Sequence, residues 1–140
     1  GPQHNLTYIH NLYKHSYINI VTETQYEWDG IIHITEKSLQ PLWFYQLPII
    51  IATPHHIKRM RELYDFDWFD DFLNHSYDSY ENHALRFHKI RREILRLSKM
   101  KSDIKKFFKQ NKKRFEHNRE VVRELQYSKH DINFFKSIQI

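Results

Sequence analysis

The chain has 140 residues, which is enough for one domain with a real core and too few for a large two-domain enzyme. It has no cysteine and only two glycines, which excludes disulfides, a cysteine-based zinc site or nucleophile, and the glycine-rich phosphate loops of Walker and dinucleotide-binding folds. The net charge of +5 is uneven: residues 86–114 hold 13 Lys or Arg against two acids, which is typical of a surface that binds anions or nucleic acid.

No apolar stretch approaches the roughly 18 residues of a membrane span, and no signal peptide is visible. We therefore expect a soluble, cytoplasmic protein without a membrane span. The chain begins with Gly1-Pro2, which is typical of the scar of a cleaved tag, so residues 1–3 are left out of the fold prediction.

The predicted elements up to residue 64 alternate between helix and strand, which favours an α/β fold. They are a short amphipathic helix over 4–16, a strand over 17–24, a loop over 25–30, a helix that begins after Thr35 and ends near Gln46, a strand over 49–52 and a helix over 55–64. Residues 49–52 are too apolar for an edge strand, so we expect this strand to be buried and parallel. Pro48 should end the helix before it, because proline cannot continue a helix.

The second half of the chain predicts long helices. An acidic and aromatic segment over 65–82 is expected to form a turn or short strand and then a short helix. From Ser79 to Leu125, apolar residues recur at steps of three and four, which predicts two long helices or one bent helix, with joints at 101–103 and 110–111. Asp131 is expected to cap a last short piece.

The first candidate site is the start of the helix after Thr35. Glu36 and Lys37 lie in its first turn, where backbone N–H groups and the helix dipole favour an anion. Beside the carboxyl end of a strand, such a pair could hold a ribose hydroxyl and a phosphate of a nucleotide. The alternative, which spacing alone favours, is that Thr35 caps the helix, Glu36 complements its dipole and Lys37 is solvated.

Histidines and acidic residues give weaker signals. His55 and His56 follow the buried strand at a helix start, so they are candidate phosphate contacts. None of the 11 histidines has the i, i+4 spacing of a helical ligand pair, and no metal or cofactor is predicted. Asp65-Phe66-Asp67 has the Asp-x-Asp form with which some sugar-transfer enzymes hold a metal and a diphosphate, but the tripeptide is common by chance, and we expect a structural role.

A second candidate site is the basic surface of the C-terminal helices. It could bind nucleic acid, a membrane surface or an acidic protein, and the alternative is a solvated helix face. Its cations are Arg91, Arg92, Lys105, Lys106, Lys112, Lys113 and Arg114.

Several short motifs follow one another between residues 17 and 97. They are Thr-Glu-Lys-Ser at 35–38, an apolar strand led by a proline, a helix, and an aromatic segment that contains Ser-Tyr-Asp at 76–78. Their order resembles the C-terminal part of a glycosyltransferase-like family of bacteriophage and large-virus proteins that is related to the exostosin and fucosyltransferase group. The matching positions are Thr35, Glu36, Lys37, Pro41, Pro48, Ile49, Pro54, Leu63, Phe66, Phe69, Asp70, Ser76, Tyr77 and Asp78. The family's second lysine is Gln40 here, and residues 52–56 replace its glycine-containing loop.

The resemblance implies the nucleotide-sugar-binding half of a GT-B glycosyltransferase. The expected fold is a partial Rossmann-like α/β core over 4–97 with few parallel strands, followed by a basic helical extension over 98–140. Glu36 would contact the ribose and Lys37 a phosphate of the nucleotide-sugar donor, with Glu23 near the same cleft. An N-terminal acceptor-binding domain, which would supply the catalytic base, is not contained in these 140 residues.

We therefore expect a donor-binding fragment or a reduced form of a transferase, in the host-cell cytoplasm if the chain is viral. Two other functions stay open. One is a non-catalytic interaction module whose basic helices bind nucleic acid or an acidic protein. The other is a structural role in which the long C-terminal helix pairs with another chain.

Overall fold

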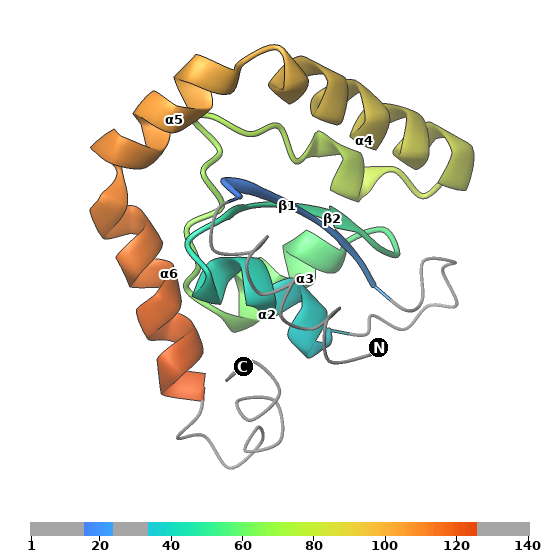
Figure 1. The fold of residues 1–140 in the computed structure, drawn as a ribbon. Coiled ribbons are helices and arrows are strands. Elements are labelled where there is room, and N and C mark those ends of the chain that lie inside the picture. The colour runs from blue at the N-terminus through green and yellow to red at the C-terminus, as the bar shows by residue number, and fades with distance from the viewer. Residues whose placement is uncertain (1–15, 24–33, 126–140) are drawn as a thin grey trace, which may run out of the picture.

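The computed structural model describes residues 16–23 and 34–125 and shows a mostly helical α/β fold (Figure 1). Its elements are β1 (Ile18–Thr22), α2 (Glu36–Trp43), β2 (Leu47–Ile51), α3 (His56–Leu63), the 3₁₀ helix η1 (Ser76–Ser79), α4 (His83–Ser98), α5 (Lys101–Gln110) and α6 (Lys112–Leu125). The helix predicted over 4–16, the loop over 25–30 and the cap at Asp131 lie outside the described residues. No helix among the described residues is long and apolar enough to cross a membrane.

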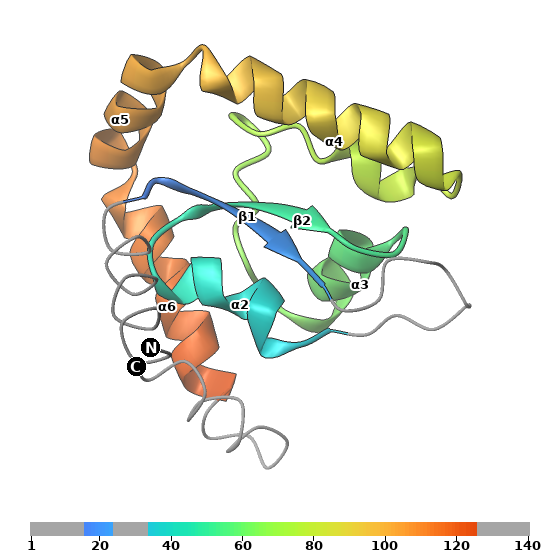
Figure 2. The same cartoon turned by 45° about the vertical axis from the view of Figure 1, so that its right-hand side comes forward.

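The two strands pair in parallel, as the sequence predicts. Ile18 lies opposite Leu47 and Thr22 lies opposite Ile51, and α2 connects the strands. Helix α4 covers one face of the sheet, while α2 and α3 cover the other (Figures 1 and 2). This arrangement explains why β2 is apolar along its whole length, since both of its faces pack against helices.

Helix α2 ends at Trp43, earlier than the predicted end near Gln46. Tyr45 adopts a left-handed conformation with φ of 57°, and the N–H of Gln46 donates to the carbonyl of Pro41 at 2.9 Å. This six-to-one bond is typical of the Schellman motif that closes a helix. The left-handed residue is usually glycine, so a tyrosine in its place gave no signal in the sequence.

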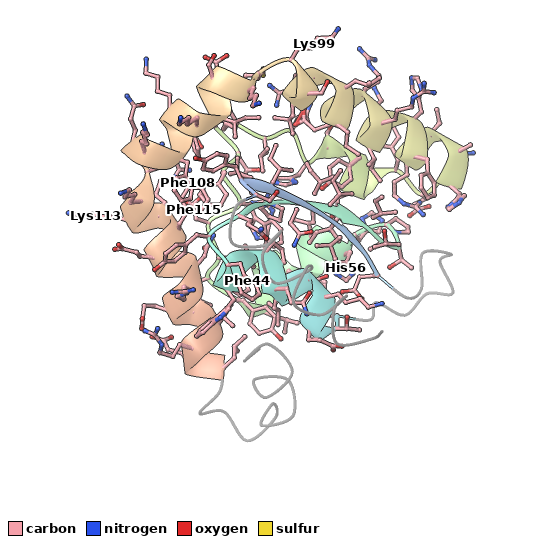
Figure 3. The ribbon with its side chains drawn as sticks, viewed as in Figure 1. Phe44, His56, Lys99, Phe108, Lys113 and Phe115 are labelled. Carbon is pink, nitrogen blue, oxygen red and sulfur yellow. The ribbon has the colours of Figure 1, made fainter. Side chains whose placement is uncertain are left out.

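The C-terminal half forms three helices instead of the predicted two or one. The breaks fall at Lys99-Met100 and at Asn111, within two residues of the expected joints. Ile104, Phe115 and Val122 from α5 and α6 join the hydrophobic core around the sheet. Figure 3 shows Phe108 and Phe115 pointing inward from these helices, while Lys99 and Lys113 point outward. Residues 98–125 therefore pack on the α/β core.

The segment between α3 and η1 is held against α6 by polar contacts. The guanidinium of Arg114 donates to Asp67 at 2.6 Å and to Asp71 at 2.7 Å. The Oδ1 of Asn118 accepts a hydrogen bond from the N–H of Asp67, and its Nδ2 donates to the carbonyl oxygen of Asp67. These bonds explain why Asn118 can interrupt the apolar stripe of α6, and they give the second aspartate of Asp65-Phe66-Asp67 a structural role.

Candidate functional site

The carboxyl ends of β1 and β2 lie side by side, since the two strands are parallel and in register. Glu23 follows β1 directly, and its N–H donates to the carbonyl of Ile51 at the end of β2. The side chain of Glu23 is buried, with an exposed fraction of 2% for the residue. A buried carboxylate must be hydrogen-bonded, so its partners define the site.

The carboxylate of Glu23 binds the first turn of α2. It accepts hydrogen bonds from the hydroxyl of Thr35 at 2.8 Å, from the hydroxyl of Ser38 at 2.5 Å and from the N–H of Ser38 at 3.2 Å. The hydroxyl of Thr35 also accepts from the N–H of Lys37, as the predicted cap requires. The protein's own carboxylate therefore occupies the place at this helix N-terminus where the sequence suggests an external anion.

Ser38 links the carboxylate to His56. The Nε2 of His56 lies 2.8 Å from the Ser38 hydroxyl, which already donates to Glu23 and therefore accepts the Nε2 proton. Burial lowers the pKa of His56, although the charge of Glu23 opposes this effect. The chain of bonds from Glu23 through Ser38 to His56 joins the ends of both strands (Figure 3 shows His56 at the start of α3). Ser38 is fully buried and does not donate to the histidine, so it is not arranged as a nucleophile.

A second internal carboxylate occupies the N-terminus of α3. Asp78 accepts the N–H groups of Ile57 at 2.8 Å and of Lys58 at 2.9 Å, and its carbonyl accepts the N–H of His55. His55 is left-handed with φ of 67°, a conformation that favours glycine. The resembled family has a glycine-containing loop at residues 52–56. In this chain His55 adopts the left-handed conformation that such a glycine would allow.

The structure brings only some of the predicted site residues together. Glu23 and His56 meet through Ser38 inside the protein, whereas Glu36 is half-buried and Lys37 is exposed on the first turn of α2. His55 is half-buried, with its Nε2 3.3 Å from Glu81. Ser38 and Asp78 belong to motifs of the sequence, but no role was predicted for either side chain, because their roles depend on partners more than ten residues away.

The basic surface is smaller than predicted. The side chains of Arg91, Arg92, Lys105, Lys106, Lys112 and Lys113 are exposed. Arg114 is different, because its guanidinium is paired with Asp67 and Asp71 and lies over the ring of Phe69. Its charge is neutralised within the fold, so Arg114 is not part of this surface.

A second buried network holds the middle of β2. The N–H of Ile50 donates to the hydroxyl of Tyr77, which lies 3.1 Å from Nδ1 of His75. The Nε2 of His75 is 2.8 Å from the carbonyl of Trp68 and must donate to it. Nδ1 therefore accepts the Tyr77 proton, which requires a neutral imidazole, and burial lowers the pKa of His75.

Stability is expected to fall as the pH decreases from about 7 to about 5. In the folded protein burial lowers the pKa of His56 and of His75, while in the unfolded chain both take up protons below a pKa of about 6.5. Each such histidine lowers the free energy of unfolding by up to about 1.4 kcal/mol per pH unit in this range. Urea denaturation at a series of pH values measures the slope.

The variant His75→Gln should give a shallower slope over the same range, whatever its stability at neutral pH. The carboxylate of Asp67 does not account for this range. Burial raises the pKa of Asp67, but hydrogen bonds from Arg114 and the Phe69 N–H lower it below its ordinary value, so its contribution is lost only in stronger acid. Equal slopes for the variant and the unchanged protein would contradict the neutral assignment of His75.

A scan against protein-family models, a search of curated proteins and a search of solved structures each give no match. The residues and their geometry therefore carry the functional argument. Among the described residues, no group of three or more His, Asp or Glu side chains is arranged to hold a metal ion.

Proposed function

We propose that this chain is a nucleotide-sugar-binding domain related to glycosyltransferases, with a Rossmann-like core that forms the donor half of a GT-B arrangement. One observation carries the proposal. Glu23, at the end of β1, bonds Thr35 and Ser38 and so fixes the first turn of α2 at the carboxyl edge of two parallel strands. Ligands of open α/β sheets bind outside this edge, and Glu36 and Lys37 lie on that turn.

The contacts between distant motifs support the proposal. The Thr-Glu-Lys-Ser turn is bonded to the end of β1 through Glu23. Tyr77 and Asp78, from the second matching motif, bond the backbone of β2 and the first turn of α3. Two segments that carry the resemblance are thus hydrogen-bonded to the same pair of strands or to the helix that follows them, which is the arrangement expected of a preformed site.

The helix ends restrict how such a ligand is held. Glu23 and Asp78 already accept N–H groups in the first turns of α2 and α3, so these amides do not cradle a diphosphate. The exposed ammonium of Lys37 would pair with the phosphate charge, and the carboxylate of Glu36 would accept hydrogen bonds from the ribose hydroxyls. In transfer, Lys37 would stabilise the charge of the leaving diphosphate.

Calorimetric and thermal-shift titration with a panel of nucleoside diphosphates and nucleotide sugars tests this function. We expect saturable binding, with a stabilisation of about 2.7 kcal/mol at a ligand concentration 100 times the dissociation constant. Lys37→Ala and Glu36→Ala should abolish the binding at this turn. Lys37 is exposed and Glu36 is half-buried, so both variants should melt close to the unchanged protein in the absence of ligand.

Lys113→Ala is the matched control, because it removes one lysine from an outward-facing position on α6 (Figure 3). Binding that survives Lys37→Ala but is lost in Lys113→Ala would contradict the proposed site. A cooperative melt without a shift for any nucleotide would also count against the proposal.

The exposed cations favour one second candidate, a non-catalytic module that binds nucleic acid or an acidic protein. Six of the seven predicted basic residues remain exposed on α4, α5 and α6. Under this function, neutralising Lys105, Lys106, Lys112 and Lys113 together should abolish binding, whereas Lys37→Ala should not. Affinity should also fall steeply with added salt.

A further inference from the structure

A polar hollow of about 330 Å³ lies between the loop before η1 and the side of α4. It is separate from the first turn of α2, because none of residues 35–38 lines it. Its lining residues are Asn74, Ser76, Lys89, Arg92, Glu93 and Arg96.

One wall of the hollow is a closed ion pair. The carboxylate of Glu93 accepts from Nε of Arg96 at 2.5 Å and from its Nη2 at 2.9 Å, and it also accepts the N–H of Asn74 at 2.6 Å. The same guanidinium donates to the carbonyl of Phe72 at 2.8 Å. The two charges cancel each other, and the pair fixes the loop against α4.

The remaining groups are hydrogen-bond donors with unused capacity. The Oδ1 of Asn74 accepts the N–H of Ser76 at 2.9 Å, which leaves the Nδ2 of Asn74 and the hydroxyl of Ser76 without a partner among the described residues. Lys89 and Arg92 pair with no acidic side chain in the described parts of the chain. The ammonium of Lys89 lies 5.5 Å from the centre of the Tyr80 ring, which helps to position it.

We propose that this hollow binds a phosphate-bearing ligand. Two cations, a hydroxyl and an amide, contributed by two segments, surround a space in which the one carboxylate is already satisfied. A phosphate group offers several strong acceptor oxygens and up to two negative charges, and the guanidinium of Arg92 can bind two of these oxygens at once. The proposal does not depend on nucleotide-sugar binding at α2.

Calorimetric titration with inorganic phosphate and with pyrophosphate at low salt tests the site. The double variant Lys89→Gln/Arg92→Gln should weaken binding by about tenfold or more. Lys112→Gln/Lys113→Gln, which removes the same charge from α6, should leave the affinity within about twofold, as should Lys37→Ala. Ser76→Ala removes one donor without changing the charge and should weaken binding to a smaller extent.

Vesicles of phosphatidylcholine with and without phosphatidic acid distinguish a lipid headgroup from free phosphate. Retention on the acidic vesicles alone, lost in Lys89→Gln/Arg92→Gln, would assign the site to a lipid phosphate. Binding of phosphate and pyrophosphate without vesicle retention would assign it to a small molecule. Equal losses in the two double variants, or no binding of any phosphate probe by the folded protein, would overturn the proposal.

Discussion

Glu23→Ala is expected to lower the free energy of unfolding by about 3 kcal/mol, since the change leaves the hydroxyl and N–H of buried Ser38 and the hydroxyl of half-buried Thr35 without this acceptor. It also removes the link between the end of β1 and the first turn of α2. Chemical denaturation in urea measures the loss. If the turn carries the ligand site, the same variant should lose nucleotide binding even where it is still folded.

Two variants serve as controls for this result. Glu23→Gln keeps the shape of the side chain and one acceptor oxygen, so its loss should be clearly smaller than that of Glu23→Ala. Thr22→Ala changes the exposed neighbour on β1 and should have little effect. A loss below about 1 kcal/mol for Glu23→Ala would contradict the description of the site as built on this carboxylate.

Phe115→Ala is expected to lower the free energy of unfolding by about 3–5 kcal/mol. Phe115 is 1% exposed. The centre of its ring lies 4.6 Å from that of Phe69, on which it stacks, and 5.0 Å from that of Phe108. The change would leave a cavity between α6, α5 and the segment after α3. The measurement is again urea denaturation, with one cooperative transition expected for the unchanged protein.

The exposed neighbour provides the control for the core variant. Glu116 is exposed on the same turn of α6, so Glu116→Ala should change the free energy of unfolding by less than about 0.5 kcal/mol. A small effect of Phe115→Ala would show that the C-terminal helices contribute little to the core. A large one would mean that a chain truncated after residue 97 cannot keep the same core.

Local patterns predicted much of the fold. The β-branched residues of β1, the apolar run of β2 and the periodic face of α3 predicted these elements with errors of one or two residues at each end. The end of α2 was predicted too late, because its closure depends on a left-handed tyrosine where a glycine is usual. The long C-terminal pattern predicted both joints to within two residues but not the number of helices, since its apolar period continues across the breaks.

The candidate site could be predicted only in part. The cap at Thr35 placed Glu36 and Lys37 on the first turn of α2, because capping depends on neighbouring residues. The partners that organise the turn come from elsewhere: Ser38 is 15 residues from Glu23 and 18 from His56. The pairing of Arg114 with Asp67 spans 47 residues, so a count of basic residues could not detect it.

Mapping of backbone amide chemical shifts by NMR, with and without a nucleoside diphosphate, tests the central claim most directly. The measurement is best made in the Lys89→Gln/Arg92→Gln variant, so that the polar hollow beside α4 does not contribute. We predict that the largest shifts fall on residues 35–38 and on residues 53–57, at the carboxyl edge of the two strands. Shifts confined to α5 and α6, or no shifts at all, would contradict a nucleotide-sugar site at this edge.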